Sequence, residues 1–483
     1  MERTSIVIIG TGFAGLGMAI RLKQAGIDDF VIFEQSADLG GTWRDNHYPG
    51  AACDIESHLY SFSFEPNPGW TRMFAPQAEI LAYLRHCAEK YDILRHISFN
   101  STVAKGTFDK KSNEWTIKLV DGRTVQAPVV VSGCGGLSRP TLPEIEGIDT
   151  FTGKWFHSAR WDANYDLSGK TVAVIGTGAS SIQVVPAIAG TVKKLHLFQR
   201  TPPWIMPRPD RAMREVERVL FAQLPPMQTV LRARIFWRHE LGAYGFTVNP
   251  KIMRLGAYLG KRFLAREVRD SALRERLTPK YTFGCKRVLI SNDYYEAVQR
   301  PNVDLVTVGI KRVVPRGVEM VDGSVVVVDA IVYCTGFEAA ECAAPFELKG
   351  IDGQDLNDEW KSGAEAYLGM TVTGFPNMFM IVGPNTGLGH SSMVFMIESQ
   401  IAYILSCLQW MRFKNVKRVD VMADAQARFN KHLHARLAKT VWATDCNAWY
   451  RTRSGKNTTL WPGFTVEFRW RTRRFDPSVY LTA

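Results

Sequence analysis

The sequence predicts an α/β fold with two Rossmann-like dinucleotide-binding units, because one local pattern occurs twice. Residues 5–10 form an apolar stretch that runs into the glycine-rich segment Gly10-Thr-Gly-Phe-Ala-Gly15. Residues 171–176 form a second apolar stretch, which runs into Gly176-Thr-Gly-Ala-Ser-Ser181. A buried strand followed by closely spaced glycines is typical of a strand that turns sharply into a helix. Residues 207–280 lack strand patterns, are rich in Arg, Leu, Phe and Ala, and predict a helical insertion.

The composition is that of a globular protein with a basic surface. A length of 483 residues is typical of about three domains of ~150 residues. The chain is 46% hydrophobic and 22% charged, and its net charge is +12. Such a charge can attract nucleic acid, a membrane surface or a phosphate-rich nucleotide. Because no nucleic-acid-binding motif accompanies it, we expect a nucleotide and no nucleic acid.

The eight cysteines are scattered and none forms Cys-x-x-Cys, which excludes a zinc ribbon or a redox dithiol and predicts no metal site. This pattern suits a reducing compartment. The first strand begins near residue 5, which leaves no room for a signal peptide, and the apolar run at 401–411 is far shorter than the ~20 residues of a membrane span. We expect a cytoplasmic protein without an integral membrane segment, and leave peripheral membrane contact open.

Each part of the first unit has a physical reason. A helix is expected over residues 14–25 and a second strand over residues 30–33, which ends at an acid. The first glycine allows the tight turn, the second allows backbone to approach a pyrophosphate, and the third allows helix and strand to pack closely. The acid can accept hydrogen bonds from a ribose diol. The predicted dinucleotide-binding residues here are Gly10, Gly12, Phe13, Ala14, Gly15 and Glu34.

The second unit departs from the first at two places. Ser181 replaces the third glycine, and the strand over residues 194–198 ends in Gln199-Arg200-Thr201 rather than in an acid. An arginine can grip a 2′-phosphate that an acid would repel, so this site should prefer NADPH over NADH. The predicted binding residues are Gly176, Thr177, Gly178, Ala179, Ser180, Ser181, Arg200 and Thr201.

The two halves also repeat further downstream. Asp121-Gly122 and Asp322-Gly323 predict hairpin turns, and a triplet of small residues begins 12 residues after each Asp, at Gly133 and at Cys334. The repeat indicates two related nucleotide domains, as in the flavoprotein disulfide-reductase class of folds. Cations decorate the helical insertion, which lies between the two parts of the second nucleotide domain. We expect amphipathic helices with a solvated basic face; a lid over the substrate pocket that also touches a membrane surface is the alternative. These cations are Arg232, Arg234, Arg238, Arg254, Lys261, Arg262, Arg266 and Arg269.

Between the two glycine-rich segments lies a sequence that resembles the fingerprint of the Baeyer–Villiger monooxygenases, a family of flavin enzymes. Its specified residues are Phe151, Gly153, His157, Trp161 and Asp162. The related flavin-containing monooxygenases usually end this motif with an aromatic and a basic residue, so Trp161-Asp162 favours the first family. A second motif of the family, Gly-x-Trp-x₄-Tyr-Pro-Gly-x₃-Asp, matches from Gly41 to Asp54. Trp449-Tyr450 and Trp461-Pro462 resemble the subgroup with 4-hydroxyacetophenone monooxygenase, and cyclohexanone monooxygenase belongs to the same family.

The resemblance implies an FAD- and NADPH-dependent enzyme that inserts one oxygen of dioxygen beside the carbonyl of a ketone or aldehyde. The product is an ester or a lactone, formed through a C4a-peroxyflavin. It also implies the domains: residues 1–150 and 331–483 bind FAD, residues 151–206 and 281–330 bind NADPH, and residues 207–280 are the helical insertion.

By the same resemblance, Thr42 and Trp43 lie along the flavin, and Asp54 lies near the isoalloxazine and the nicotinamide. Tyr60 would contact the flavin phosphates, and the backbone of Val103 would meet the adenine.

The segment Gly284-Cys-Lys-Arg287 resembles the one that carries the family's active-site arginine, so Arg287 is predicted to be catalytic. An always-charged guanidinium can stabilise an anionic peroxide and the oxyanion of its adduct. Asp54 would orient this arginine through an ion pair, and Lys286 would contact the NADPH phosphate. His157 lies in the linker and is expected to hold the two sites in register rather than to transfer protons.

Four alternatives remain open at this stage. A flavin-containing monooxygenase would oxygenate nitrogen or sulfur nucleophiles, a chemistry that needs the protonated hydroperoxide and is disfavoured by Arg287. A hydroxylase and a nucleotide-sensing flavoprotein without oxygenase activity are the second and third. A disulfide reductase is disfavoured because Cys-x-x-Cys is missing.

Overall fold

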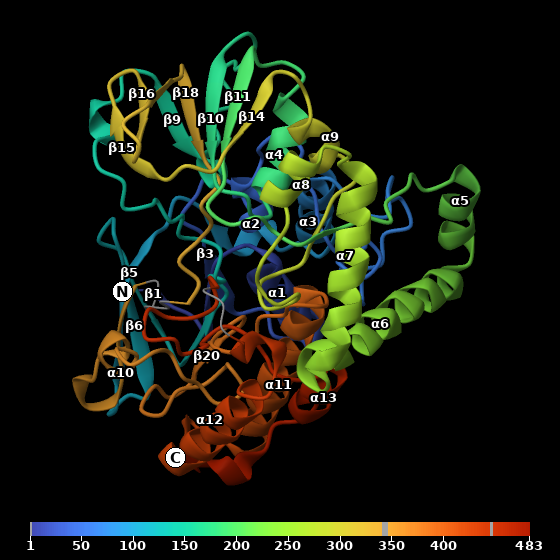
Figure 1. Ribbon diagram of the computed structural model, residues 1–483. Helices are drawn as coiled ribbons and strands as arrows, with labels where there is room; N and C mark the ends of the chain where they lie inside the picture. Colours follow the sequence, from blue (N-terminus) through green and yellow to red (C-terminus); the bar gives the residue numbers. More distant parts are fainter. Residues whose placement is uncertain (1, 341–345, 445–447) are drawn as a thin grey trace.

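The computed structural model describes residues 2–340, 346–444 and 448–483, and two parallel five-stranded sheets form its centre (Figure 1). Each sheet has an apolar central strand between two apolar neighbours. The first sheet has the order β20 (Met378–Met380), β8 (Val129–Ser132), β2 (Ile6–Ile9), β3 (Phe30–Phe33) and β4 (Ile97–Ser98). The second has the order β9 (Lys154–His157), β18 (Ala330–Tyr333), β10 (Thr171–Ile175), β11 (Lys194–Phe198) and β14 (Val303–Val306).

The two βαβ units predicted from the glycine-rich segments are confirmed. In the first, β2 pairs in parallel with β3, and α1 (Phe13–Gln24) connects them. In the second, β10 pairs in parallel with β11 through α4 (Ser181–Ile188). The central strands β2 and β10 are apolar and buried almost throughout, as strands covered on both faces must be.

The boundary expected at residue 330/331 needs correction. Strand β18 crosses it and pairs with β10 on one side and β9 on the other, so it belongs to the second sheet. Its apolar residues pack into the core of that sheet, and the chain leaves only after Tyr333. With this shift, the division into a discontinuous first domain, a second domain and an insertion remains our proposal.

Both predicted hairpin turns are confirmed. Asp121-Gly122 lies between β6 (Glu114–Leu119) and β7 (Thr124–Ala127), and Asp322-Gly323 lies between β16 (Gly317–Met320) and β17 (Val325–Val327). Both glycines have positive φ, +92° and +83°. These hairpins belong to the antiparallel parts of two further sheets. One has the order β1 (Glu2–Arg3), β7, β6, β5 (Val103–Asp109), β19 (Glu347–Lys349), and the other β15 (Ile310–Val314), β16, β17.

The insertion is helical, as expected, and projects from the body on the right of Figure 1. Its helices are α5 (Glu215–Gln223), α6 (Pro225–Thr247), α7 (Met253–Glu267) and α8 (Ser271–Arg276). On α6, Arg234 and Arg238 are exposed as expected, but large apolar side chains such as Trp237 and Leu241 also point into solvent, which was not expected. Other polar side chains of α6, among them Gln228, anchor it to the rest of the protein.

The C-terminal part returns to the first sheet and covers it. Strand β20 completes that sheet, and α11 (Met393–Lys414) packs against α1. Among the described residues, α11 is the one helix long and apolar enough to cross a membrane; 67% of its apolar window is buried inside the protein, so it is a core helix here. The remaining elements are α2 (Thr42–Asp45), α3 (Gln77–Lys90), α9 (Tyr294–Val298), α10 (Leu356–Glu359), α12 (Ala423–Leu437), α13 (Thr465–Thr472), β12 (Ile205–Met206), β13 (Leu289–Ile290), β21 (Val419–Val421) and β22 (Tyr480–Thr482).

Candidate active site between the two nucleotide-binding units

The first glycine-rich loop has the shape that a dinucleotide requires. Gly10 has φ +96°, and a Cβ on Gly15 would lie 1.9 Å from the Gly10 carbonyl oxygen. Gly12 caps α1, and a Cβ there would meet nothing closer than 3.9 Å. Phe13 and Ala14 are buried behind the loop. The N-terminus of α1 is therefore open to a phosphate while the loop behind it is tightly packed, which fits FAD or a similar dinucleotide.

Glu34 follows β3 directly and is a buried carboxylate within a hydrogen-bond network. It accepts hydrogen bonds from the Thr11 amide (3.1 Å) and hydroxyl (2.6 Å) and from the Ser36 amide (3.0 Å). Arg44 lies 2.9 Å from its second oxygen and also pairs with Asp45. This network holds the acid at the loop, and Arg44 belongs to no motif that predicts its part in it.

The second loop repeats this arrangement. Gly176 has φ +111°, and a Cβ on Gly178 would enter open space. The hydroxyl of Thr177 donates to the Thr201 carbonyl (2.9 Å), which joins the loop to the end of β11. Ser181 is fully buried, and its hydroxyl has no hydrogen-bond partner among the described residues. A buried hydroxyl without a partner beside an open loop fits a bound dinucleotide at this place.

Two cations meet at the end of β11. Arg200 is exposed, and Lys286 is half-buried with its ammonium 5.0 Å from the Tyr281 ring centre. Burial, followed by the positive charge of Arg200, lowers the pKa of Lys286. Because the two cations repel each other, an anion such as a phosphate would fit between them.

Arg287 and Asp54 form an ion pair between segments 233 residues apart in sequence. The Nε and Nη2 of Arg287 donate to one Asp54 oxygen at 2.8 and 2.5 Å, and Nη1 donates to the Leu388 carbonyl at 3.3 Å. Both side chains keep about a third of their surface accessible, 27% and 32%. The carboxylate of Asp54 raises the pKa of Arg287, so the guanidinium is a fixed positive charge with one edge held and one side open.

The Tyr-Pro-Gly motif joins the two domains. The Tyr48 hydroxyl donates to Gln183 on α4 (2.9 Å), and the Gln183 amide donates back to the Ala52 carbonyl (2.9 Å). A Cβ on Gly50 would lie 2.6 Å from the Gln183 carbonyl oxygen, so only glycine fits there. The motif thus carries Asp54 on a segment that is fixed against the second domain, a role that the sequence did not reveal.

The fingerprint segment contains β9, the edge strand of the second sheet. The same segment also contacts the first domain. Gly153 allows close approach, since a Cβ would lie 2.4 Å from the Asp329 carbonyl oxygen. His157 ends β9, accepts a hydrogen bond from the Ala159 amide (3.0 Å), and has its pKa lowered to about 4 by burial. Its ring is therefore neutral near pH 7, which agrees with a positioning role.

The other fingerprint residues hold this segment in place. Phe151 is buried, and Trp161 packs edge-on against Phe156 with ring centres 4.8 Å apart. The Trp161 carbonyl accepts a hydrogen bond from His47 of the first domain (3.1 Å). Asp162 pairs with Lys154 (2.7 Å).

The expected flavin-side residues form one group beside the first loop, except for Val103. Thr42 and Trp43 begin α2, and the Trp43 indole donates to the Tyr60 hydroxyl (3.2 Å). The Tyr60 ring packs edge-on against Phe13. Val103 is buried at the start of β5. It follows, in sequence, a segment whose backbone is hydrogen-bonded to the backbone of Glu34.

Sequence reasoning missed a cluster of titratable groups next to Arg287. His390 is buried, and burial, followed by the positive charges of His239 and Arg287, lowers its pKa to about 3. His239 on α6 lies between the His390 carbonyl (2.8 Å) and the Glu56 carboxylate (2.8 Å). These residues are far apart in sequence and belong to no local motif, so no sequence signal could have joined them.

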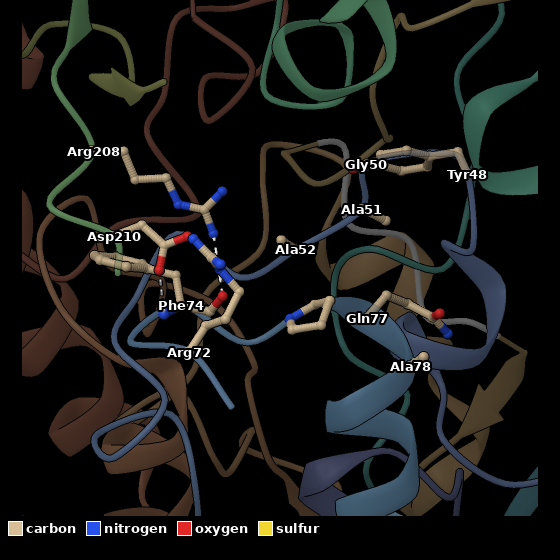
Figure 2. Close-up of a pocket in the computed structure, with 11 residues that line it drawn as sticks. Tyr48, Gly50, Ala51, Ala52, Arg72, Phe74, Gln77, Ala78, Arg208 and Asp210 are labelled. Atoms are coloured by element: carbon tan, nitrogen blue, oxygen red, sulfur yellow. Dashed lines mark hydrogen bonds and ion pairs between the residues drawn. The ribbon is translucent and has the colours of Figure 1, made fainter. Parts of the chain in front are cut away.

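A cavity of about 370 Å³ opens at the seam between the first domain and the insertion (Figure 2). Arg72 and Asp210 form an ion pair (2.9 Å) on one side, and Tyr48 and Gln77 lie on the other. Its lining includes Ala52 but neither Asp54 nor Arg287. The cavity is thus adjacent to the ion pair and is not the chemical centre itself.

Comparisons with known proteins agree with this geometry. Residues 3–232 match the family model described as flavin-binding monooxygenase-like. A Baeyer-Villiger monooxygenase of Pseudomonas aeruginosa is 50% identical over 98% of this chain and 90% of its own length. A Baeyer-Villiger monooxygenase of Streptomyces coelicolor is 46% identical over 99% of this chain and 92% of its own.

Solved structures match over the same extent. OTEMO in complex with FAD and NADP is 29% identical with a TM-score of 0.89, and covers 99% of both chains. Cyclohexanone monooxygenase from Rhodococcus sp. Phi1 bound to NADP+ is 27% identical with a TM-score of 0.88, over 98% of this chain and 97% of its own.

Proposed function

Because the chain belongs to the Baeyer–Villiger monooxygenase family, we propose that Arg287, held by Asp54, is its catalytic arginine. The protein is an FAD- and NADPH-dependent monooxygenase that inserts one oxygen of dioxygen beside the carbonyl of a ketone or aldehyde, giving an ester or lactone. The observation that carries the proposal is the ion pair between Asp54 of the first domain and Arg287 of the second. It is the point where both nucleotide-binding units contribute a side chain to one site.

The two cofactors divide between the two loops in this proposal. FAD binds the loop from Gly10 to Gly15 with Glu34 at its ribose, and Thr42, Trp43 and Tyr60 lie along it. NADPH binds the loop from Gly176 to Ser181. The bound flavin, once reduced by NADPH, supplies the activation of dioxygen. Two observations support this division: the tight packing behind Gly15, and the Ser181 hydroxyl, which has no hydrogen-bond partner among the described residues.

Arg287 acts on negative charge that develops on oxygen. When the carbonyl carbon is attacked, its oxygen becomes anionic, and a fixed guanidinium beside it lowers the barrier. One donor of this kind is typically worth about 10²–10³ in rate. Asp54 holds one edge of the guanidinium through two hydrogen bonds, so the arginine cannot swing away. The Leu388 carbonyl fixes a third nitrogen from the C-terminal part of the chain.

Arg200 and Lys286 distinguish NADPH from NADH in this proposal. Their charges lie close enough for Arg200 to lower the pKa of Lys286. A 2′-phosphate between them would relieve that repulsion and gain charge-assisted hydrogen bonds from both. Thr201, tied to Thr177 through its carbonyl, keeps this strand end beside the loop.

We also propose a small ketone or aldehyde as substrate and the cytoplasm as location. One structural neighbour is a cyclohexanone monooxygenase with bound epsilon-caprolactone, a lactone. The free thiols of Cys53, Cys87, Cys134, Cys334 and Cys407 support a reducing compartment, whereas Cys285 is disulfide-bonded and does not.

The experiment compares three proteins with NADPH, labelled dioxygen and a panel of ketones and thioethers. Wild-type enzyme should place one labelled oxygen in an ester, read by mass spectrometry. R287A should lose this product by at least about 10²-fold while NADPH still reduces its flavin. R316A, which removes an exposed arginine on the β15–β16 turn, is the matched control and should keep full activity. Ester formation by R287A at the wild-type rate would refute the assignment.

A further inference from the structure

Several polar side chains of helix α6 point inward, next to the buried Ile235. Gln228 donates to His58 (3.0 Å) and to the Asn67 carbonyl (2.7 Å). Arg232 donates to the carbonyls of His58 (2.7 Å) and Ser61 (3.0 Å). These bonds, together with Ile235 in the apolar core, dock the inner face of α6 on the first domain.

Further along the helix, Glu240 performs the same task toward the C-terminus. It is buried and accepts hydrogen bonds from the amide (3.1 Å) and hydroxyl (2.6 Å) of Thr465 and from the Val466 amide (3.1 Å). These donors lie at the first turn of α13, where a carboxylate is favourable. The orientation of α6 is therefore fixed by both of its neighbours.

The outer face of α6 carries an apolar row that Arg234 interrupts once and that ends just after the helix. With Arg234 counted, successive positions are three or four residues apart, which places them on one side of a helix. They are large and strongly exposed, up to 76% at Leu241 and 55% at Trp237. The row consists of Met227, Val230, Trp237, Leu241, Tyr244 and Val248, with Arg234 at the one polar position.

Two helices close to α6 also expose large apolar side chains. After a short turn, α7 exposes Leu255 (59%) and Tyr258 (56%). On α13, which Glu240 holds against α6, Val466 and Trp470 are 41% and 64% exposed. Figure 1 shows α6 projecting from the body, with α7 rising from its end and α13 below. We call the apolar row of α6, together with these exposed side chains of α7 and α13, the outer apolar face.

The outer apolar face lies within a strongly positive part of the chain. Residues 224–269 contain nine Lys and Arg against two acids, Glu240 and Glu267, and Glu240 is buried. Arg254, Lys261 and Arg262 on α7 are all exposed. Exposed aliphatic and aromatic side chains among cations are the pattern of segments that lie in the headgroup region of a bilayer.

We propose that the outer apolar face binds the surface of an anionic phospholipid bilayer. Removing an apolar row of this size from water is favourable, and the exposed cations attract anionic headgroups. A second copy of the chain fits less well, because it would bring the same excess of positive charge against itself. The enzyme would lie on the bilayer through α6 and α7 without crossing it.

The test measures co-sedimentation of the flavin-loaded enzyme with vesicles. One set consists of phosphatidylcholine alone and the other of equal parts phosphatidylcholine and phosphatidylglycerol. Wild-type protein should bind the anionic set far more tightly and lose binding as salt rises. R254Q/K261Q should weaken that binding by about 25-fold, since each cation near an anionic surface contributes about fivefold. W237Q/L241Q should weaken it by about tenfold or more, because it removes apolar area.

The control is V120Q/V321Q. It replaces two valines that are 70% and 65% exposed, within the range of Trp237 and Leu241, but that lie on hairpin turns of the body. It should bind as wild type does. Flavin absorbance and the unfolding midpoint check that each variant is folded. Wild-type protein that stays in solution with anionic vesicles would overturn the proposal. So would a wild-type dimer that W237Q/L241Q dissociates while vesicle binding is absent or unchanged.

Discussion

The two nucleotide-binding units place their loops in the same way on two different sheets. Gly10 has φ +96°, and a Cβ there would lie 3.0 Å from the carbonyl oxygen of Gly133, just after β8. Gly176 has φ +111°, and a Cβ there would lie 2.5 Å from the carbonyl oxygen of Cys334, just after β18. In both units, the loop thus turns against the end of the neighbouring parallel strand. This shared backbone determines where a dinucleotide can lie.

The units differ in the side chains placed on that backbone. At the third loop position the first has Gly15 and the second has Ser181. At the end of the second strand, the first has buried Glu34 and the second has exposed Arg200. An acid suits a ribose diol and an arginine suits a phosphate. The comparison teaches that the loop fixes position whereas the strand end selects the nucleotide, and four predictions test it.

The largest effect should come from Gly15→Ala. Its new Cβ would lie 1.9 Å from the Gly10 carbonyl oxygen, so α1 and β2 would have to separate. We expect a loss of about 3 kcal/mol or more of folding free energy and loss of bound flavin. Flavin content and the denaturation midpoint measure this. Gly178→Ala is the control, since a Cβ there meets open space, and it should keep its flavin; G15A with wild-type flavin content would contradict the prediction.

Glu34→Ala should have the next largest effect. It leaves the amide and hydroxyl of Thr11 and the Ser36 amide without their acceptor, and Arg44 retains Asp45 and the Asp38 carbonyl. We expect a loss of about 2 kcal/mol of folding free energy, together with weaker FAD binding. Urea denaturation and flavin titration measure both. Glu215→Ala, at an exposed position on α5, should change neither. Unaltered FAD affinity in E34A would exclude Glu34 from the ribose site.

Arg200→Ala should act on the second nucleotide and not on folding. Loss of a charged hydrogen bond to phosphate is worth about 2 kcal/mol, or roughly 30-fold in NADPH affinity. NADH affinity should change by less than about twofold, because NADH has no 2′-phosphate. Stopped-flow reduction of the flavin by each nucleotide measures this, with R316A as the control. An unchanged ratio of the two affinities would show that the strand end does not select the nucleotide.

The sequence was sufficient where the signal is local. Strand β3 over Phe30–Phe33 and strand β11 over Lys194–Phe198 have their expected bounds. A short apolar run that follows a glycine-rich loop and a helix strongly favours a buried strand. The hairpins at Gly122 and Gly323 follow in the same way from turn chemistry. Strand β18 shows the limit, since nothing local tells which sheet an apolar strand joins.

The contacts that assemble the site carry no such local signal. Gln183 meets Tyr48 over 135 residues, and Leu388 meets Arg287 over 101. Both use groups that are common everywhere in proteins, an amide and a carbonyl. The exposed apolar side chains of α6 were not expected for a related reason: which face of a helix is buried depends on the partners it docks on, and here these include polar groups of the first domain.

The smallest effect should come from Ser181→Ala. The direction of the change in stability and in NADP+ affinity tests whether the second loop, unlike the first, binds its nucleotide through a side chain. The Ser181 hydroxyl is fully buried with no partner in the part of the chain that the structure describes. Removing it should leave the unfolding midpoint without NADP+ unchanged or slightly higher, because a buried unpaired hydroxyl does not stabilise the fold. If the bound nucleotide is the missing partner, NADP+ affinity should fall by about 1 kcal/mol, or roughly fivefold. Calorimetric titration measures this, and Ser168→Ala, on the loop before β10, is the control. A lower midpoint in S181A with unaltered NADP+ affinity would mean that the hydroxyl serves the fold, and that the second loop binds its nucleotide through backbone alone, as the first does.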